Sequence, residues 1–265
     1  MFKIFQRLWQ VNWAEQWQYR ANLIMYLLYW LVSPIIYLAV WTSIANTKGS
    51  VNGLTATDFA TYYMTLLIVD QVTSNIVIHT FAYKIQDGTL SGELVRPIHP
   101  MLTNALVNNI AFKILTIMGF IPIWTLLFFL FKPVYSAVTW SGVLLAIPAM
   151  VIGFFVGFLL SAAVTALAFW TTRVYSIHEF YYALILLFSG QFVPLTLMPK
   201  LIQDIAQYLP FQLLIYFPIQ LILGKLSTAQ IVQGYLMGAI WLATAIILFQ
   251  LVWRNGVKRF SAVGA

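Results

Sequence analysis

The run WSGVLLAIPAMVIGFFVGFLLSAAVTALAFW, residues 140–170, contains no aspartate, glutamate, lysine or arginine. A helix needs about 20 mostly apolar residues to cross the hydrocarbon core of a membrane. This run is long enough to cross with a tilt or to project beyond the bilayer. It therefore predicts a membrane-spanning helix and indicates that lipid surrounds much of the chain.

The composition of the whole chain supports the same conclusion. Of its 265 residues, 62% are hydrophobic and 8% are charged, whereas a soluble domain carries roughly 25% charged residues. The absence of cysteine excludes disulfides and thiolate metal sites. The net charge of +7 fits lysine and arginine on the cytoplasmic side of a membrane protein better than nucleic-acid binding. The N-terminus lacks the short apolar core and cleavage site of a secretory signal.

Six runs in total are apolar enough to span a membrane. They are residues 21–45, 59–81, 102–131, 140–170, 177–193 and 231–253. Strands of a membrane barrel would be shorter and would alternate in polarity. We therefore predict an all-α integral membrane fold with six transmembrane helices in one domain, residues 21–265.

The positions of lysine and arginine orient this bundle. Six spans place both termini on one side, together with Lys3, Arg7, Arg20, Lys84, Arg96, Arg173, Arg254, Lys258 and Arg259. The other side would hold Lys48, Lys132, Lys200 and Lys225. The side richer in positive charge is cytoplasmic by the positive-inside rule, so we expect both termini in the cytoplasm.

The first twenty residues carry an aromatic stripe. Phe5, Trp9, Trp13 and Trp17 follow one another at i+4 spacing, and most polar residues fall elsewhere. This pattern predicts an amphipathic helix in the membrane interface. It would serve as a simple anchor or as a lever that joins a cytoplasmic partner to the first span.

A second irregular region, residues 194–224, is apolar yet contains Pro194, Pro199, Pro210 and Pro218. Proline disrupts helix interiors, and broken backbone at membrane depth is tolerated only against protein or a watery cavity. We predict short helices that enter the outer leaflet and return. The alternative is an ordinary extracellular loop.

Two groups of residues inside the spans are candidates for function. Asp70 and Gln71 lie in the second span, where a carboxylate is costly and by default functional. They would serve a transport pathway or a proton relay, or else a hydrogen bond to a neighbouring helix. Gly153, Gly157 and Ser161 recur at i+4 and predict a close helix contact, either between two chains or within one bundle.

No catalytic group can be assigned. His178 and Glu179 have no complementary cluster and would cap the fifth span, and no Ser-His-Asp set or carboxylate pair is present. We expect no catalytic residue, metal site or cofactor site. LSGEL, residues 90–94, resembles the signature motif of ABC ATPases, but the chain has no G-x-x-x-x-G-K-[ST] phosphate loop, so ATP binding by that route is excluded.

Three motifs appear in a characteristic order: YRANLIMYLL at 19–28, GELVRPIHP at 92–100 and LPFQLLIYFPIQLILG at 209–224. With the interfacial helix, six spans and the proline-broken segment, they resemble the ABC-2 type transporter permeases over nearly the whole chain. The likeness is closest to the DUF990-like branch, which is grouped with daunorubicin and viologen exporters.

The resemblance implies a permease subunit in the bacterial cytoplasmic membrane. It would export an amphipathic, lipid-like or drug-like substrate by alternating access. A separate cytoplasmic ATPase subunit would use ATP and magnesium, and a second permease, identical or related, would complete the pathway. Residues 82–100 would be the coupling region. Its contact residues with the ATPase would be Asp87, Leu90, Glu93, Leu94 and Arg96.

The residues themselves favour this coupling role in part. Gly88, Gly92 and Pro97 can turn the chain at either end of a short helix. Its leucines would lie on one side and gain from burial against a partner. The alternative for this segment is a solvated loop without a partner. The alternatives for the whole chain are a proton-coupled secondary transporter that uses Asp70 and a membrane scaffold that transports nothing.

Overall fold

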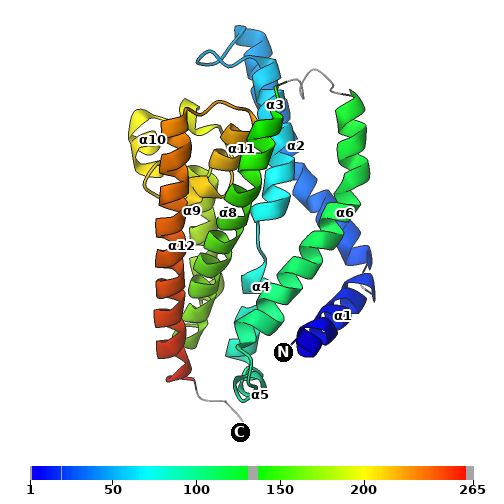
Figure 1. Cartoon of the computed structure of the whole chain (residues 1–265), viewed down its shortest axis with the longest axis vertical. Coiled ribbons are helices and arrows are strands. Elements are labelled where there is room, and N and C mark those ends of the chain that lie inside the picture. The colour runs from blue at the N-terminus through cyan, green and yellow to red at the C-terminus, as the bar shows by residue number, and fades with distance from the viewer. Residues whose placement is uncertain (1, 19, 131–136, 261–265) are drawn as a thin grey trace.

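The computed structural model of the chain describes residues 2–18, 20–130 and 137–260, and every regular element in this part is helical. The long helices Trp140–Ala166 and Thr228–Val257 run side by side along the longest axis of the molecule, and Arg20–Lys48 and Val107–Leu130 are inclined to it (Figure 1). The α-helices are α1 Phe2–Gln18, α2 Arg20–Lys48, α3 Ala56–Thr73, α4 Val77–Gln86, α5 Ser91–Leu94, α6 Val107–Leu130, α8 Trp140–Ala166, α9 Val174–Phe188, α10 Lys200–Ala206, α11 Tyr216–Ile222 and α12 Thr228–Val257.

The two ends of the bundle differ in content. Figure 1 shows α5, the start of α1 and the end of α12 near one end, and α10 and the start of α3 near the other. A π-helical turn, Met101–Leu106, leads from the region of α5 into α6. The first of these ends is called the α5 end below.

Within the residues that the structure describes, four stretches of helix are long and apolar enough to cross a membrane. They are Ile24–Lys48, Val107–Leu127, Trp140–Phe169 and Thr228–Val257, and they coincide with the predicted first, third, fourth and sixth spans. Helices Lys200–Ala206 and Phe211–Ile222 would add a fifth span if taken together, but they are bent by 79°. The chain is therefore a helical protein built to pass the membrane several times.

The predicted second span, 59–81, is divided into two helices. α3 ends at Thr73 and α4 begins at Val77. Side chains of α6 help to satisfy the interrupted backbone, because the Asn109 Oδ1 accepts a hydrogen bond from the Ile76 N–H at 3.0 Å. We call residues 74–76 the break. A break of this kind is stable at membrane depth only where protein or a cavity surrounds it.

The predicted fifth span is also shorter than expected. α9 has 15 residues, fewer than the roughly 20 that a straight crossing requires. It ends at Phe188, and Gly190 follows with φ +85°, a left-handed conformation that favours glycine. The chain there turns away from the helix axis toward α10.

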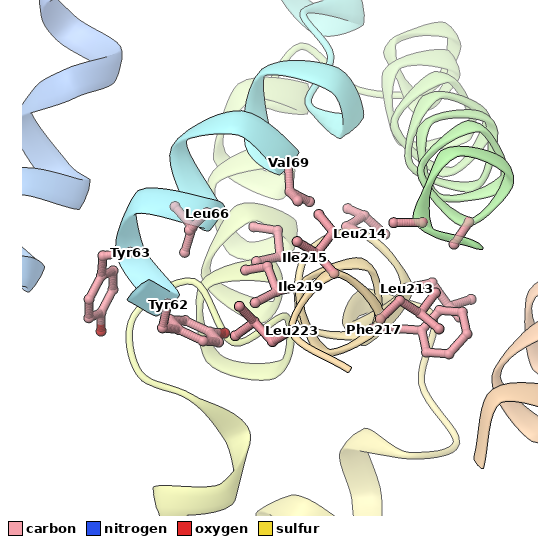
Figure 2. Packing of buried hydrophobic residues seen from close by; sticks show 14 of the residues in the cluster. Tyr62, Tyr63, Leu66, Val69, Leu213, Leu214, Ile215, Phe217, Ile219 and Leu223 are labelled. Carbon is pink, nitrogen blue, oxygen red and sulfur yellow. The ribbon is translucent and has the colours of Figure 1, made fainter. Parts of the chain in front are cut away.

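The proline-broken segment is part of the core. The side chains of Ile215 and Ile219 are fully buried, and Figure 2 shows them beside Leu66 and Val69 of α3. The Tyr62 hydroxyl donates to the Gly190 carbonyl at 2.7 Å and thereby fixes the turn before α10. The segment is therefore packed against α3 and α8 rather than lying free as a surface loop.

The small residues of α8 allow this close packing. A Cβ atom on Gly153 would lie 2.6 Å from the Leu213 carbonyl oxygen, and one on Gly157 would lie 3.3 Å from Leu214 Cδ2. Ser161 is buried on the same helix. In the structure Gly153 and Gly157 make contacts within one bundle, and an additional contact of this face with a second chain remains a prediction.

The N-terminal helix forms as predicted and lies against α6. The Asn108 Nδ2 donates to the Asn12 Oδ1 at 3.1 Å, which joins the two helices. Trp9 and Trp13 stack with ring centroids 5.8 Å apart, and Trp17 is half exposed. The side chain of Phe5 lies outside the described residues. A position of α1 in the membrane interface remains a prediction.

Candidate functional site

Asp70 and Gln71 lie on the last turn of α3, directly before the break. Lys113 of α6 reaches this turn, and its Nζ donates to the Gln71 carbonyl at 2.9 Å and to the Ser74 Oγ at 3.1 Å. The same Nζ lies 5.4 Å from the centre of the Phe154 ring. A cation near the last carbonyls of a helix is favourable. Lys113 therefore stabilises the end of α3 at membrane depth.

This arrangement gives a first prediction. Lys113→Met should lower the free energy of unfolding by about 2 kcal/mol, because the Gln71 carbonyl and the Ser74 hydroxyl lose their partner. For a chain of this size, that corresponds to a melting temperature lower by roughly 5 °C in detergent. Lys225→Met, which removes an exposed ion pair with Asp58, is the control and should change little. Equal melting temperatures for both variants would contradict the role of Lys113.

A cavity of about 250 Å³ adjoins the break. It is bounded by α2, α3, α8, α9 and the residues before α11, and Asp70, Asn75, Ser161 and Glu179 are among the residues that line it. Its volume is slightly below the range of roughly 300–1,000 Å³ typical of small-molecule sites. The cavity thus places the intramembrane carboxylate singled out by the sequence on the wall of a partly open pocket.

Two hydroxyl groups on the wall have no hydrogen-bond partner among the described residues. They are the Ser161 Oγ and the Tyr181 Oη, and both atoms are buried. A buried hydroxyl without a partner costs about 1–3 kcal/mol, so native proteins usually satisfy it with water or a ligand. The sequence offered no sign of this pair, because the residues lie on different helices and meet only in the folded bundle.

The predicted coupling region is ordered at the α5 end. Leu90 is fully buried and Leu94 partly buried, both against a core that contains Phe81 and Trp253. The Glu93 carboxylate accepts from the Lys84 Nζ at 2.7 Å, and the two side chains are only 13% and 29% exposed. Three of the five predicted contact residues, Leu90, Glu93 and Leu94, are therefore buried or partly buried against their own chain, and their contact with an ATPase remains a prediction.

A different set of side chains forms the outer surface of this region. Val95 is 85% exposed and Tyr83 is 64% exposed, and Arg96 and Asp87 are also exposed. Asp87 accepts hydrogen bonds from the backbone and the hydroxyl of Thr89 and so shapes the turn. The sequence did not single out Tyr83 and Val95, because the exposure of the last turn of α4 and of the residue after α5 depends on how the rest of the chain packs against them.

The coupling region is tied to two further elements. The His99 ring lies 4.7 Å from the Trp253 ring of α12, centroid to centroid, and its Nδ1 accepts from the Met101 N–H. Burial lowers the pKa of His99 below its ordinary value. On the other side, the Gln86 amide donates to the Thr172 carbonyl before α9 at 3.2 Å. A displacement of this region would therefore also act on α9 and α12.

The structure is a bundle of long apolar helices. One of its helices is broken beside a cavity, and an ordered polar segment is joined to that helix. These features define an integral membrane protein of several spans. The chain belongs to the family of ABC-2 family transporter proteins, whose sequence profile matches residues 21–264. A search of curated proteins finds no match. The chain is therefore a membrane component of an ABC transporter, and membership of this family implies in general a partner ABC ATPase.

Proposed function

We propose that the chain is the permease subunit of an ABC exporter and moves an amphipathic, lipid-like or drug-like substrate by alternating access. In this proposal the broken pair α3 and α4 makes the second crossing, α9 makes the fifth, and α10 and α11 form a re-entrant segment. The positive-inside rule assigns the α5 end, and with it both termini, to the bacterial cytoplasm.

One observation carries the proposal: a single short helix joins the coupling region to the cavity. α4 runs from the break at residues 74–76 to Gln86, and α5 follows within five residues. The Lys84–Glu93 ion pair attaches α5 to α4. A push on α5 would therefore move α4 and change the break, which forms part of the cavity wall.

The driving subunit in this proposal is a separate ATPase that binds ATP and magnesium itself, while this chain binds no cofactor. Its contact would be the outer surface of the coupling region. Tyr83 and Val95 offer apolar area there, and Arg96 offers a charge. Exposed apolar groups rimmed by polar ones are typical of protein interfaces. Helix α1 would add a second contact at the same end (Figure 1).

A second permease would cover the open side of the cavity. Tyr29 and Glu179 line the cavity and are exposed on the surface of the bundle. A carboxylate that faces lipid is costly, so it normally faces protein or a water-filled space. A second copy of the chain, or a related one, that packs on α2 and α9 would remove this exposure and enclose the pathway.

The proposal is tested by expressing the chain with and without a cognate ATPase in inverted membrane vesicles. We expect uptake of a lipophilic fluorescent dye into the vesicles only with both proteins and ATP. Uptake that persists without the ATPase would contradict the proposal. Uptake that instead follows an imposed pH gradient and is lost in Asp70→Asn would support a proton-coupled carrier.

Substitution of the exposed valine provides a second test. Val95→Asp should weaken binding of the ATPase at least tenfold, equivalent to about 1.4 kcal/mol, because it places a charge in an apolar contact. Leu201→Asp is the matched control, since Leu201 is 70% exposed on α10 near the opposite end. Co-purification and ATPase titration measure the effect. Equal losses in both variants, or none in either, would rule out this surface as the contact.

A further inference from the structure

We propose that the cavity beside the break is a binding site for a small organic ammonium ion, with Asp70 as its anchor. The bound molecule would carry at least one N–H donor on an apolar body. That such a cation is cargo rests on the export function proposed above. The binding itself does not, because it requires only this chain.

The charge of the wall favours a cation. Asp70 and Glu179 both line the cavity, and no lysine or arginine lines it among the described residues. The carbonyl end of α3, at Thr73 and Ser74, also forms part of the wall and adds partial negative charge. His178 is the remaining titratable group with a cationic form on the wall.

Lys113 does not occupy the site, although it is near. It is absent from the cavity wall, and its ammonium group is directed to the Gln71 carbonyl and the Ser74 hydroxyl. Within the described part of the chain, no cationic nitrogen lies within 4.0 Å of the Asp70 carboxylate. Asp70 thus forms no ion pair with a described residue on the cavity side, and the charge of Lys113 acts on it only through space.

The two buried hydroxyls point to a ligand independently of charge. Ser161 and Tyr181 line the same cavity, and their hydroxyl oxygens are buried and have no partner among the described residues. Each can accept an N–H hydrogen bond, so together with Asp70 they match the several donors of an ammonium group. Their positions on α8 and α9 place them on walls other than the α3 wall that carries Asp70.

The rest of the wall suits an apolar body. Tyr26, Tyr29 and Trp30 of α2 line the cavity together with Ile185 and Leu214. Aromatic faces attract cations through the ring quadrupole, more strongly where water is excluded. A volume of about 250 Å³ suits a molecule such as phenethylammonium rather than a whole lipid.

Equilibrium binding to the full chain in phosphatidylcholine nanodiscs tests the site. The probe is radiolabelled phenethylammonium, with empty nanodiscs subtracted. We expect saturable binding that is weakened at least tenfold by Asp70→Asn and about threefold by Ser161→Ala. Phenylacetate and 3-phenylpropanol, which have similar bodies but negative or no charge, should not compete. Asp204→Asn, on the exposed helix α10, is the control and should bind as the unmodified chain does.

Several outcomes would overturn the site. The first is that the unmodified chain and Asp70→Asn bind phenethylammonium equally. The second is that phenylacetate or 3-phenylpropanol competes for binding, and the third is that no saturable binding is found. If Asp70→Asn does not fold, Ser161→Ala and Glu179→Gln decide by the same measurement. If the chain binds no phenethylammonium but still supports ATPase-dependent dye uptake, the ammonium site is rejected and the proposed export function stands. If the chain binds phenethylammonium but dye uptake does not depend on the ATPase, the export function is rejected and the ammonium site stands.

Discussion

Exchanging Lys84 and Glu93 should restore the coupled transport that each single charge reversal strongly reduces. In the structure these side chains form an ion pair at 2.7 Å, largely shielded from water. Glu93→Lys would place two lysines together, and Lys84→Glu would place two glutamates together. Each reversal should detach α5 from α4 and reduce ATP-driven transport roughly tenfold, which corresponds to about 1.4 kcal/mol of coupling free energy.

The double variant Lys84→Glu, Glu93→Lys rebuilds the pair with its charges exchanged. If the pair acts within the chain, transport should return to within about twofold of the original rate. If Glu93 instead contacts the ATPase directly, as the sequence suggested, the exchanged pair should remain uncoupled. Arg96→Glu is the matched control, because Arg96 is exposed next to Glu93. It should weaken ATPase affinity without being rescued by a change at Lys84. ATP hydrolysis and dye uptake, measured together, separate coupling from binding.

The different positions of Leu90 and Val95 show why the sequence predicted the segment but not its surface. Gly88, Gly92 and Pro97 were sufficient to predict a turn-rich stretch with a short helix, and α5 is such a helix. The face of α5 that turns inward is set by Phe81 and by Trp253, which is more than 150 positions away in the chain. No local pattern contains that contact, so the sequence assigned the leucines to a partner surface and left Val95 unassigned.

The break in the second span has a similar explanation. Asp70 and Gln71 were singled out in this span, yet such polar residues are also compatible with a continuous helix packed in a bundle. Asn109 and Lys113 of α6 decide the outcome here, because they supply hydrogen bonds to the end of α3 and to the Ile76 backbone. The long spans could be predicted because hydrophobic length alone specifies them.

Gly153→Ala should lower the melting temperature of the chain by roughly 5 °C, and Gly153→Leu should prevent recovery of monodisperse protein. A Cβ at this position would lie 2.6 Å from the Leu213 carbonyl oxygen, a backbone atom in a segment that the adjacent Pro210 holds. Alanine improves helix propensity by up to about 1 kcal/mol, while overpacking a tight contact costs about 1–3 kcal/mol or more. The steric term should prevail because the obstructing atom cannot rotate away.

Gly92→Ala is the matched control for this prediction, since a Cβ at Gly92 meets nothing within 4 Å. It should leave the melting temperature in detergent unchanged. The comparison also decides between the two interpretations of the small-residue face of α8. If Gly153 and Gly157 formed a contact between two chains, Gly153→Ala would dissociate a dimer in size-exclusion chromatography and leave the melting temperature of the monomer intact. A lower melting temperature at unchanged oligomeric state would place the contact inside one bundle, where α8 holds the proline-broken segment against α3.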